Sequence, residues 1–198
     1  KPKINFLKKK NWITFVGKLN DAKGYDLFGE AIIKILNKYK NWFGVVIGDE
    51  PRQKIFFDHP RLKKLGFVDH KKVLDIYSKS KIAVACSRWN EPLGRTSLEA
   101  SSRGCATIIS NRGGLPETIT HGIILKKLSP QSVYSSIERL IKNIGLMKNL
   151  QKLSYENFHH THKAAIDKID LYRKNLLGKK IIYFDVINKN RSIKILHV

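Results

Sequence analysis

The sequence predicts an α/β fold in which a parallel β-sheet of about six strands carries helices on both faces. Short continuous apolar runs recur along the chain, as expected for strands that are buried on both sides. Amphipathic stretches separate these runs, and such alternation is typical of β–α–β units. The chain has 198 residues, of which 42% are hydrophobic, so it can form one domain with a sizeable core.

The apolar runs give the expected strands in chain order. The first run covers residues 12–16 and stops at Gly17, and the second covers 43–47 and stops at Gly48. The remaining strands are expected over residues 65–68, 82–86, 106–109 and 122–125. Because helical stretches lie between the runs, we expect the strands to pair in parallel.

The helices are predicted from the spacing of apolar side chains. Residues 24–38 place their apolar side chains on one helical face, and a short helix follows the third strand. Residues 95–103 suit a helix, with Gly104 just past its end as a C-cap. Residues 130–145 and 146–176 are expected to form two closing helices.

Three segments are expected along the chain. Residues 1–10 form a basic linker, residues 11–176 form a Rossmann-like domain, and residues 177–198 form a tail. The apolar runs of the tail fit either a β-hairpin or the opening strand of a further domain. The chain starts with Lys1 rather than Met and has no signal-peptide pattern, so we expect a fragment of a longer protein.

The net charge is strongly positive. Lys and Arg number 38 against 16 Asp and Glu, a formal charge of +22. Such a charge suits an anionic partner, which could be nucleic acid, a membrane surface or a phosphorylated substrate. The basic residues are mostly lysines scattered along the chain, which is typical of a solvated surface and argues against nucleic acid as the main partner. Peripheral contact with anionic lipid remains compatible with the charge.

Other patterns exclude several classes of protein. Cys86 and Cys105 lie far apart and form no Cys-x-x-Cys pair, which excludes a disulfide scaffold and a zinc ribbon and predicts small core residues. The histidines of residues 159–162 lack accompanying carboxylates or cysteines, so we expect a solvated helix rather than a metal site. No apolar run approaches the roughly 18 residues of a membrane span.

The loops after the expected strands carry the chemistry, because ligands of such sheets bind outside the carboxyl ends of the strands. Lys18 and Lys23 follow the first strand, and a glycine, Gly94, precedes a helix that starts with Arg95. Free N–H groups at a helix start bind anions, so this combination predicts a phosphate-bearing ligand. Glu99, in the first turns of that helix, is suited to accept the two vicinal hydroxyls of a ribose.

Three motifs in order resemble the C-terminal domain of retaining glycosyltransferases of family 4, which have the two-Rossmann-domain GT-B fold. The first motif is Val16-Gly17-Lys18-Leu19 continuing to Lys23-Gly24, and the second is Gly66-Phe67-Val68. The third is the Glu-x7-Glu signature from Glu91 to Glu99, with Pro92, Gly94, Leu98 and Ala100 in their usual places. The resemblance covers roughly residues 11–176, and three motifs in order are more specific than any one alone.

The resemblance implies a role for each matched residue. Lys18 and Lys23 would pair with the donor diphosphate and stabilise the leaving group, and Glu91 would contact hydroxyls of the transferred sugar, so these three are the catalytic candidates. The donor-binding candidates are Gly17, Leu93, Gly94 and Arg95 around the phosphates, Glu99 on the ribose, and Gly66, Phe67 and Val68 around the base. Lys18 replaces the usual Arg and Leu93 replaces a common Phe.

The resemblance also implies a function. The chain would be the donor-binding domain of a hexosyltransferase that moves a hexose from a nucleotide sugar to a glycan or lipid-linked acceptor, as in lipopolysaccharide or capsule synthesis. The acceptor site would lie on a missing N-terminal domain, so the fragment alone would be inactive. No Asp-x-Asp occurs, which agrees with metal-independent transfer and no cofactor beyond the donor substrate. We expect a cytoplasmic enzyme, or one peripheral to the inner face of the cell membrane.

Two alternatives stay open at this point. One is a basic nucleotide-, lipid- or nucleic-acid-binding module without transferase activity. The other is an epimerase-like Rossmann module, although the chain has no Gly-x-Gly-x-x-Gly after its first strand. The sequence leaves the sugar, the base and the acceptor unspecified.

Overall fold

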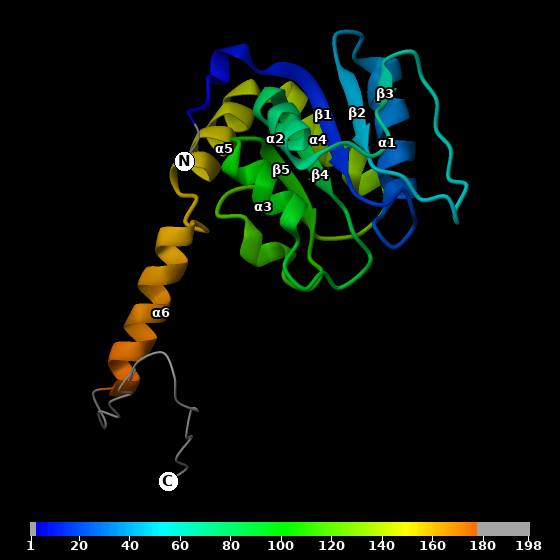
Figure 1. The fold of residues 1–198 in the computed structure, drawn as a ribbon. Coiled ribbons are helices and arrows are strands. Elements are labelled where there is room, and N and C mark those ends of the chain that lie inside the picture. The colour runs from blue at the N-terminus through cyan, green and yellow to red at the C-terminus, as the bar shows by residue number, and fades with distance from the viewer. Residues whose placement is uncertain (1–2, 178–198) are drawn as a thin grey trace. The chain divides into compact units, whose positions relative to one another are not determined.

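The computed structural model describes residues 3–177 (Figure 1). The chain separates into two compact units, Lys1–His159 and His160–Val198. The first unit contains the sheet, and the described part of the second is the helix α6, His162–Leu177. The hairpin or further strand predicted for the tail lies outside the described residues. No helix within residues 3–177 has the length and apolar character needed to span a membrane.

The first unit is built on a parallel sheet of six strands in the order β3-β2-β1-β4-β5-β6. Their bounds are Lys10–Val16 for β1, Phe43–Ile47 for β2, Leu62–Lys64 for β3, Ser80–Ala85 for β4, Ala106–Ser110 for β5 and Ile123–Leu125 for β6. This is the strand order of the Rossmann fold. Successive strands are added toward one edge of the sheet from β1 to β3 and toward the other edge from β4 to β6, so the order reverses between β1 and β4. The predicted α/β fold with about six parallel strands is therefore confirmed.

Helices cover both faces of the sheet, as predicted (Figure 1). The helices α1, Tyr25–Lys38, and α4, Pro130–Lys142, pack against each other and share the larger apolar core with the sheet. On the other face, α2, His70–Lys79, and α3, Arg95–Ser102, enclose a smaller core. The fifth helix, α5, Ile144–Glu156, packs against β5, α3 and α4.

Local sequence explains where the main helices begin. The helix α1 starts after Gly24, whose φ of 71° lies in the left-handed region that favours glycine. Its residues Leu27, Phe28, Ala31 and Ile32 are buried at the 3–4-residue spacing of one helical face. The helix α3 likewise starts after a left-handed glycine, Gly94, with a φ of 78°. Each glycine is the last residue of the loop that joins a strand to the next helix, β1 to α1 for Gly24 and β4 to α3 for Gly94.

Two predicted elements were wrong. The third strand is Leu62–Lys64 rather than 65–68, because it is an edge strand with only Leu62 buried and so lacks an apolar run. The predicted helix over 146–176 is instead two helices, α5 and α6. Asn157 ends α5, and the Thr161 hydroxyl accepts a hydrogen bond from the Ala164 amide, which caps the start of α6.

The segment expected to be a basic linker, residues 1–10, contains ordered structure. A 3₁₀ helix spans Phe6–Lys8, and β1 already begins at Lys10. Lys9 is only 5% exposed, and its ammonium donates hydrogen bonds to the carbonyls of Tyr77, at 3.1 Å, and Ser80, at 2.7 Å. Burial lowers the pKa of Lys9 from its usual value. One of the linker lysines therefore belongs to the core.

Candidate functional site

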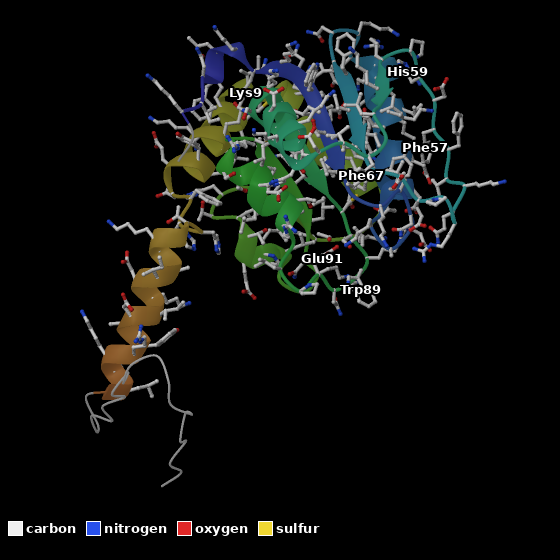
Figure 2. The ribbon with its side chains drawn as sticks, in the orientation of Figure 1. Lys9, Phe57, His59, Phe67, Trp89 and Glu91 are labelled. Atoms are coloured by element: carbon white, nitrogen blue, oxygen red, sulfur yellow. The ribbon has the colours of Figure 1, made fainter. Side chains whose placement is uncertain are left out.

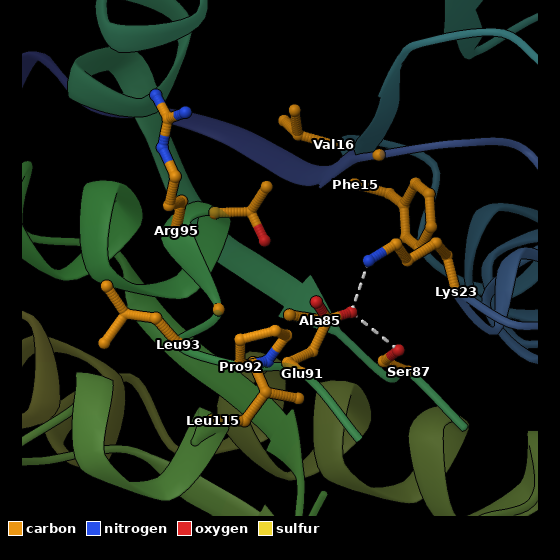
Figure 3. A pocket seen from close by; sticks show the side chains of 13 residues that line it. Phe15, Val16, Lys23, Ala85, Ser87, Glu91, Pro92, Leu93, Arg95 and Leu115 are labelled. Atoms are coloured by element: carbon orange, nitrogen blue, oxygen red, sulfur yellow. Dashed lines mark hydrogen bonds and ion pairs between the residues drawn. The ribbon is translucent and has the colours of Figure 1, made fainter. Parts of the chain in front are cut away.

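A pocket of about 380 Å³ opens at the carboxyl ends of β1 and β4, where the strand order reverses (Figure 3). Phe15, Val16 and Gly17 line it from the end of β1, and Ala85 and Ser87 line it from the end of β4. The loop into α3 closes the pocket, with lining residues Glu91, Pro92, Leu93, Gly94, Arg95 and Thr96. Ligands of doubly wound α/β sheets bind at this place in the fold.

Glu91 and Lys23 meet inside this pocket although they are far apart in sequence. The Lys23 ammonium lies 2.6 Å from the Glu91 carboxylate, whose side chain is 14% exposed. The Ser87 hydroxyl lies 2.8 Å from the same carboxylate oxygen (Figure 3). The carboxylate is therefore held in a defined orientation and faces the cavity with a cation beside it.

The loop that carries Glu91 is fixed by its backbone. Glu91 forms a parallel bridge with Gly113, and its carbonyl accepts a hydrogen bond from the Gly114 amide at 2.6 Å. Arg88, in the same loop, forms two hydrogen bonds of 2.6 Å to the Asp26 carboxylate at the start of α1. These contacts hold the loop after β4 against α1, next to Lys23.

The start of α3 forms a second wall of the pocket. Gly94 and Arg95 line the cavity, and the first amides of a helix have no partner inside the helix, so they can bind an anion there. The Arg95 side chain is 76% exposed, and Arg95 and Lys23 approach the pocket from opposite sides (Figure 3). The pocket thus combines two cations and a helix start with one carboxylate.

Glu99 lies one turn further along α3, outside the lining of this pocket. Its carboxylate is 15% exposed and lies 3.0 Å from Nε2 of His70 and 3.6 Å from Nη2 of Arg95. Arg95 therefore connects the pocket to Glu99. His70 is the first residue of α2, so Glu99 lies beside the start of that helix.

The other predicted residues do not line the pocket, as far as residues 3–177 show. Lys18 is exposed beside Gly17, and its charge acts on Glu50, whose pKa is lowered to about 2, chiefly by a hydrogen bond from Arg52. Phe67 is 83% exposed (Figure 2), and Val68 packs against the smaller core. The carbonyl of Gly66 accepts a hydrogen bond of 2.8 Å from the Gly48 amide. The structure therefore brings together six predicted residues, Gly17, Lys23, Glu91, Leu93, Gly94 and Arg95.

Sequence reasoning missed two residues of the site, Ser87 and His70. Ser87 is the second residue after β4, in a loop that sequence analysis places at the ligand-binding edge, so its position was a signal that could have identified it. His70 carries no motif, and only the packing of α2 against α3 places it beside Glu99. Trp89 lies in the loop that carries Glu91 (Figure 2). Its side chain is 60% exposed, and it is not among the residues that line the pocket.

The cysteines and histidines were considered as nucleophiles and as metal ligands. Cys86 and Cys105 are completely buried, which confirms them as small core residues, and burial raises the pKa of the Cys86 thiol to about 12. A thiol with such a pKa is a poor nucleophile. Among the described residues, no group of three or more His, Cys, Asp or Glu side chains could hold a metal ion.

Comparison with known proteins identifies the family. The model of the family "Glycosyl transferases group 1" matches residues 1–157. Spore coat protein SA of Bacillus subtilis is 30% identical over 190 residues, which are 84% of this chain and 49% of that protein. The C-terminal domain of the glycosyl transferase group 1 family protein LpcC from Francisella tularensis is 26% identical, with a TM-score of 0.66 over 75% of this chain and 84% of that domain.

A further solved structure shares the fold at lower identity. Anabaena Alr3699/HepE, solved in complex with UDP and glucose, has a TM-score of 0.66 at 15% identity over 85% of this chain and 48% of that protein. The chain spans about half the length of the curated relatives it matches. The family match, the strand order and the likeness to a C-terminal domain agree, and the chain belongs to the glycosyl transferases of group 1, with the fold of a GT-B C-terminal domain.

Proposed function

We propose that this chain is the nucleotide-sugar-binding domain of a retaining hexosyltransferase, which moves a hexose to a glycan or lipid-linked acceptor. The proposal rests on the pocket of about 380 Å³, which is lined by Lys23 and Glu91 together with the start of α3. A site that binds a nucleotide sugar needs cationic groups for the diphosphate and hydrogen-bond acceptors, such as a carboxylate, for the sugar hydroxyls.

In this proposal the diphosphate lies against Lys23, Arg95 and the first amides of α3. The Lys23 side chain is 32% exposed and already turned into the pocket, so little reorganisation is needed to meet a phosphate oxygen. Lys18, exposed beside Gly17, adds charge at the rim. These groups can neutralise the diphosphate without a divalent cation, so we propose metal-independent binding.

The transferred sugar lies over Glu91, whose carboxylate accepts hydrogen bonds from sugar hydroxyls. In the proposed front-face substitution, the bond between the anomeric carbon and the diphosphate oxygen breaks, and the acceptor oxygen bonds to the same face of the carbon. The acceptor proton passes to the departing diphosphate, which also keeps the electron pair of the broken bond. Lys23 and Arg95 stabilise the charge that builds on that leaving group.

The names of similar proteins support this proposal. Alr3699/HepE was solved with UDP-glucose, and LpsB of Rhizobium meliloti is named as a lipopolysaccharide core mannosyltransferase. We place the acceptor site on a further domain of the whole protein, because relatives are about twice as long as this chain.

The direct test is calorimetric titration of the 198-residue chain with UDP, GDP, ADP and dTDP, and with their hexose conjugates. At least one nucleotide should bind, and Glu99→Ala should weaken it at least tenfold, because hydrogen bonds to a carboxylate contribute about 1.5–3 kcal/mol each. Glu138→Gln is the matched control, since this carboxylate lies on α4, on the other face of the sheet. Absence of binding to every nucleotide in the panel would contradict the proposal.

A second titration tests the phosphate contacts. Lys23→Ala should weaken UDP much more than uridine, since only UDP carries the charge that Lys23 faces. Affinity for UDP should be the same with and without EDTA. Equal losses for UDP and uridine would mean that Lys23 does not contact phosphate, and a loss of affinity in EDTA would mean that a metal takes part.

A further inference from the structure

Glu99 contacts His70, a residue that belongs to none of the three sequence motifs. Nε2 of His70 lies 3.0 Å from Oε1 of Glu99, and Nη2 of Arg95 lies 3.6 Å from the same oxygen. Within residues 3–177, both side-chain contacts of this carboxylate go to Oε1. The second oxygen, Oε2, is therefore left to accept hydrogen bonds from a ligand.

The position of His70 is determined by the backbone around it. The Asp69 carboxylate accepts a hydrogen bond of 2.9 Å from the Lys72 amide, which caps α2 and fixes His70 as the first residue of the helix. Val73 and Tyr77 of the same helix are buried in the smaller core, which holds α2 against the sheet. Although the His70 side chain is 59% exposed, it extends from a rigid helix start toward α3.

Arg95 is the weaker of the two partners of Glu99. Its side chain is 76% exposed, its contact to Glu99 is longer, and it also lines the pocket where the diphosphate is proposed to bind. A bound phosphate would compete with Glu99 for the guanidinium. The imidazole of His70 would then be the remaining side chain that restrains the glutamate, which otherwise has several accessible rotamers.

We propose that His70 is a positioning residue, which orients Glu99 so that Oε2 accepts the ribose hydroxyls of the donor. This inference rests on the proposed function. Through Glu99, His70 would favour the binding of ribonucleotides over analogues that lack the 2′- and 3′-hydroxyls. His70 does not touch the donor in this arrangement and acts only through Glu99.

The test compares Kd values for UDP and 2′,3′-dideoxy-UDP by calorimetry, with the GDP and ADP pairs run in parallel. His70→Ala should weaken UDP roughly three- to tenfold and leave dideoxy-UDP nearly unchanged, because one hydrogen bond that orients the carboxylate is lost. His70→Gln, whose amide can still donate to Glu99, should recover most of the preference. Lys71→Ala is the matched control, since Lys71 is exposed in the same first turn of α2.

A double-mutant cycle separates positioning from direct contact. In a Glu99→Ala background, His70→Ala should have no further effect on UDP binding. Equal weakening of UDP and dideoxy-UDP by His70→Ala, or an effect that persists without Glu99, would overturn the positioning role. If His70→Ala binds UDP as tightly as the wild type does, the positioning role is overturned but the proposed function stands. Failure of the wild type to bind any of the three ribonucleotides would overturn both.

Discussion

Replacing Gly24 with alanine should destabilise the fold for two separable reasons. Gly24 adopts a φ of 71°, a left-handed conformation that costs alanine roughly 1–2 kcal/mol. A Cβ at this position would also collide with the backbone carbonyl of Cys86, which cannot move aside as the end of a flexible side chain can. Overpacking of this kind costs about 1–3 kcal/mol. Together the two effects should lower the free energy of unfolding by about 2–5 kcal/mol.

Gly66 provides a matched control for the strain alone. Its φ of 63° is similar, but a Cβ there would meet no described atom within 4 Å. Gly66→Ala should therefore lower the free energy of unfolding by only about 1–2 kcal/mol. The difference between the losses of unfolding free energy in the two variants therefore measures the cost of the collision with the Cys86 carbonyl.

Urea unfolding followed by circular dichroism measures both losses in the 198-residue chain. Lys23 precedes Gly24 and Ser87 follows Cys86, so a shift of either segment would also displace the pocket wall. UDP affinity should accordingly fall in Gly24→Ala. If Gly24→Ala and Gly66→Ala lose the same free energy within about 0.5 kcal/mol, the argument from the collision is refuted.

Three further predictions concern the core, the pH dependence and the pocket. Lys9→Met should lower the free energy of unfolding by about 1–3 kcal/mol in chemical denaturation, because buried carbonyls lose their donor; an unchanged midpoint would contradict this. Hydrogen bonds from Lys38, Tyr134 and Tyr39 lower the pKa of Glu138 from 4.5 to about 2, so the stability that Glu138 contributes is complete above pH 4.5 and is lost as the pH falls toward 2. The gap in urea midpoint between wild type and Glu138→Gln should narrow across that interval, and a constant gap would refute the assignment. Glu91→Ala should leave the UDP affinity of this chain within about twofold but lower kcat in the full-length protein, because contacts that tighten in the transition state act on turnover. Calorimetry and initial rates measure the two effects, and a large loss of UDP affinity would place Glu91 on the nucleotide instead.

Elements with strong local patterns were predictable from the sequence. The helix α1 repeats its apolar residues at helical spacing and starts after a glycine, so both its face and its N-terminal boundary follow from a short window. β3 was not predictable in this way, because an edge strand exposes Lys63 and Lys64 and buries only Leu62. The basic stretch of residues 1–10 predicts a linker, whereas the structure buries Lys9, and its two carbonyl partners make that burial tolerable.

By itself the sequence determined the class of fold, the loop that carries Glu91 and Gly94, and the helix that carries Glu99, because apolar runs and helix starts are local properties. Only the tertiary structure decided which loops meet. β1 pairs with β4 although two strands lie between them in the chain, and this crossover puts Lys23 2.6 Å from Glu91. The packing of α2 against α3 likewise brings His70 to Glu99. Such pairings depend on the free energy of the whole assembled core, to which residues distant in sequence contribute, and no short segment contains that information.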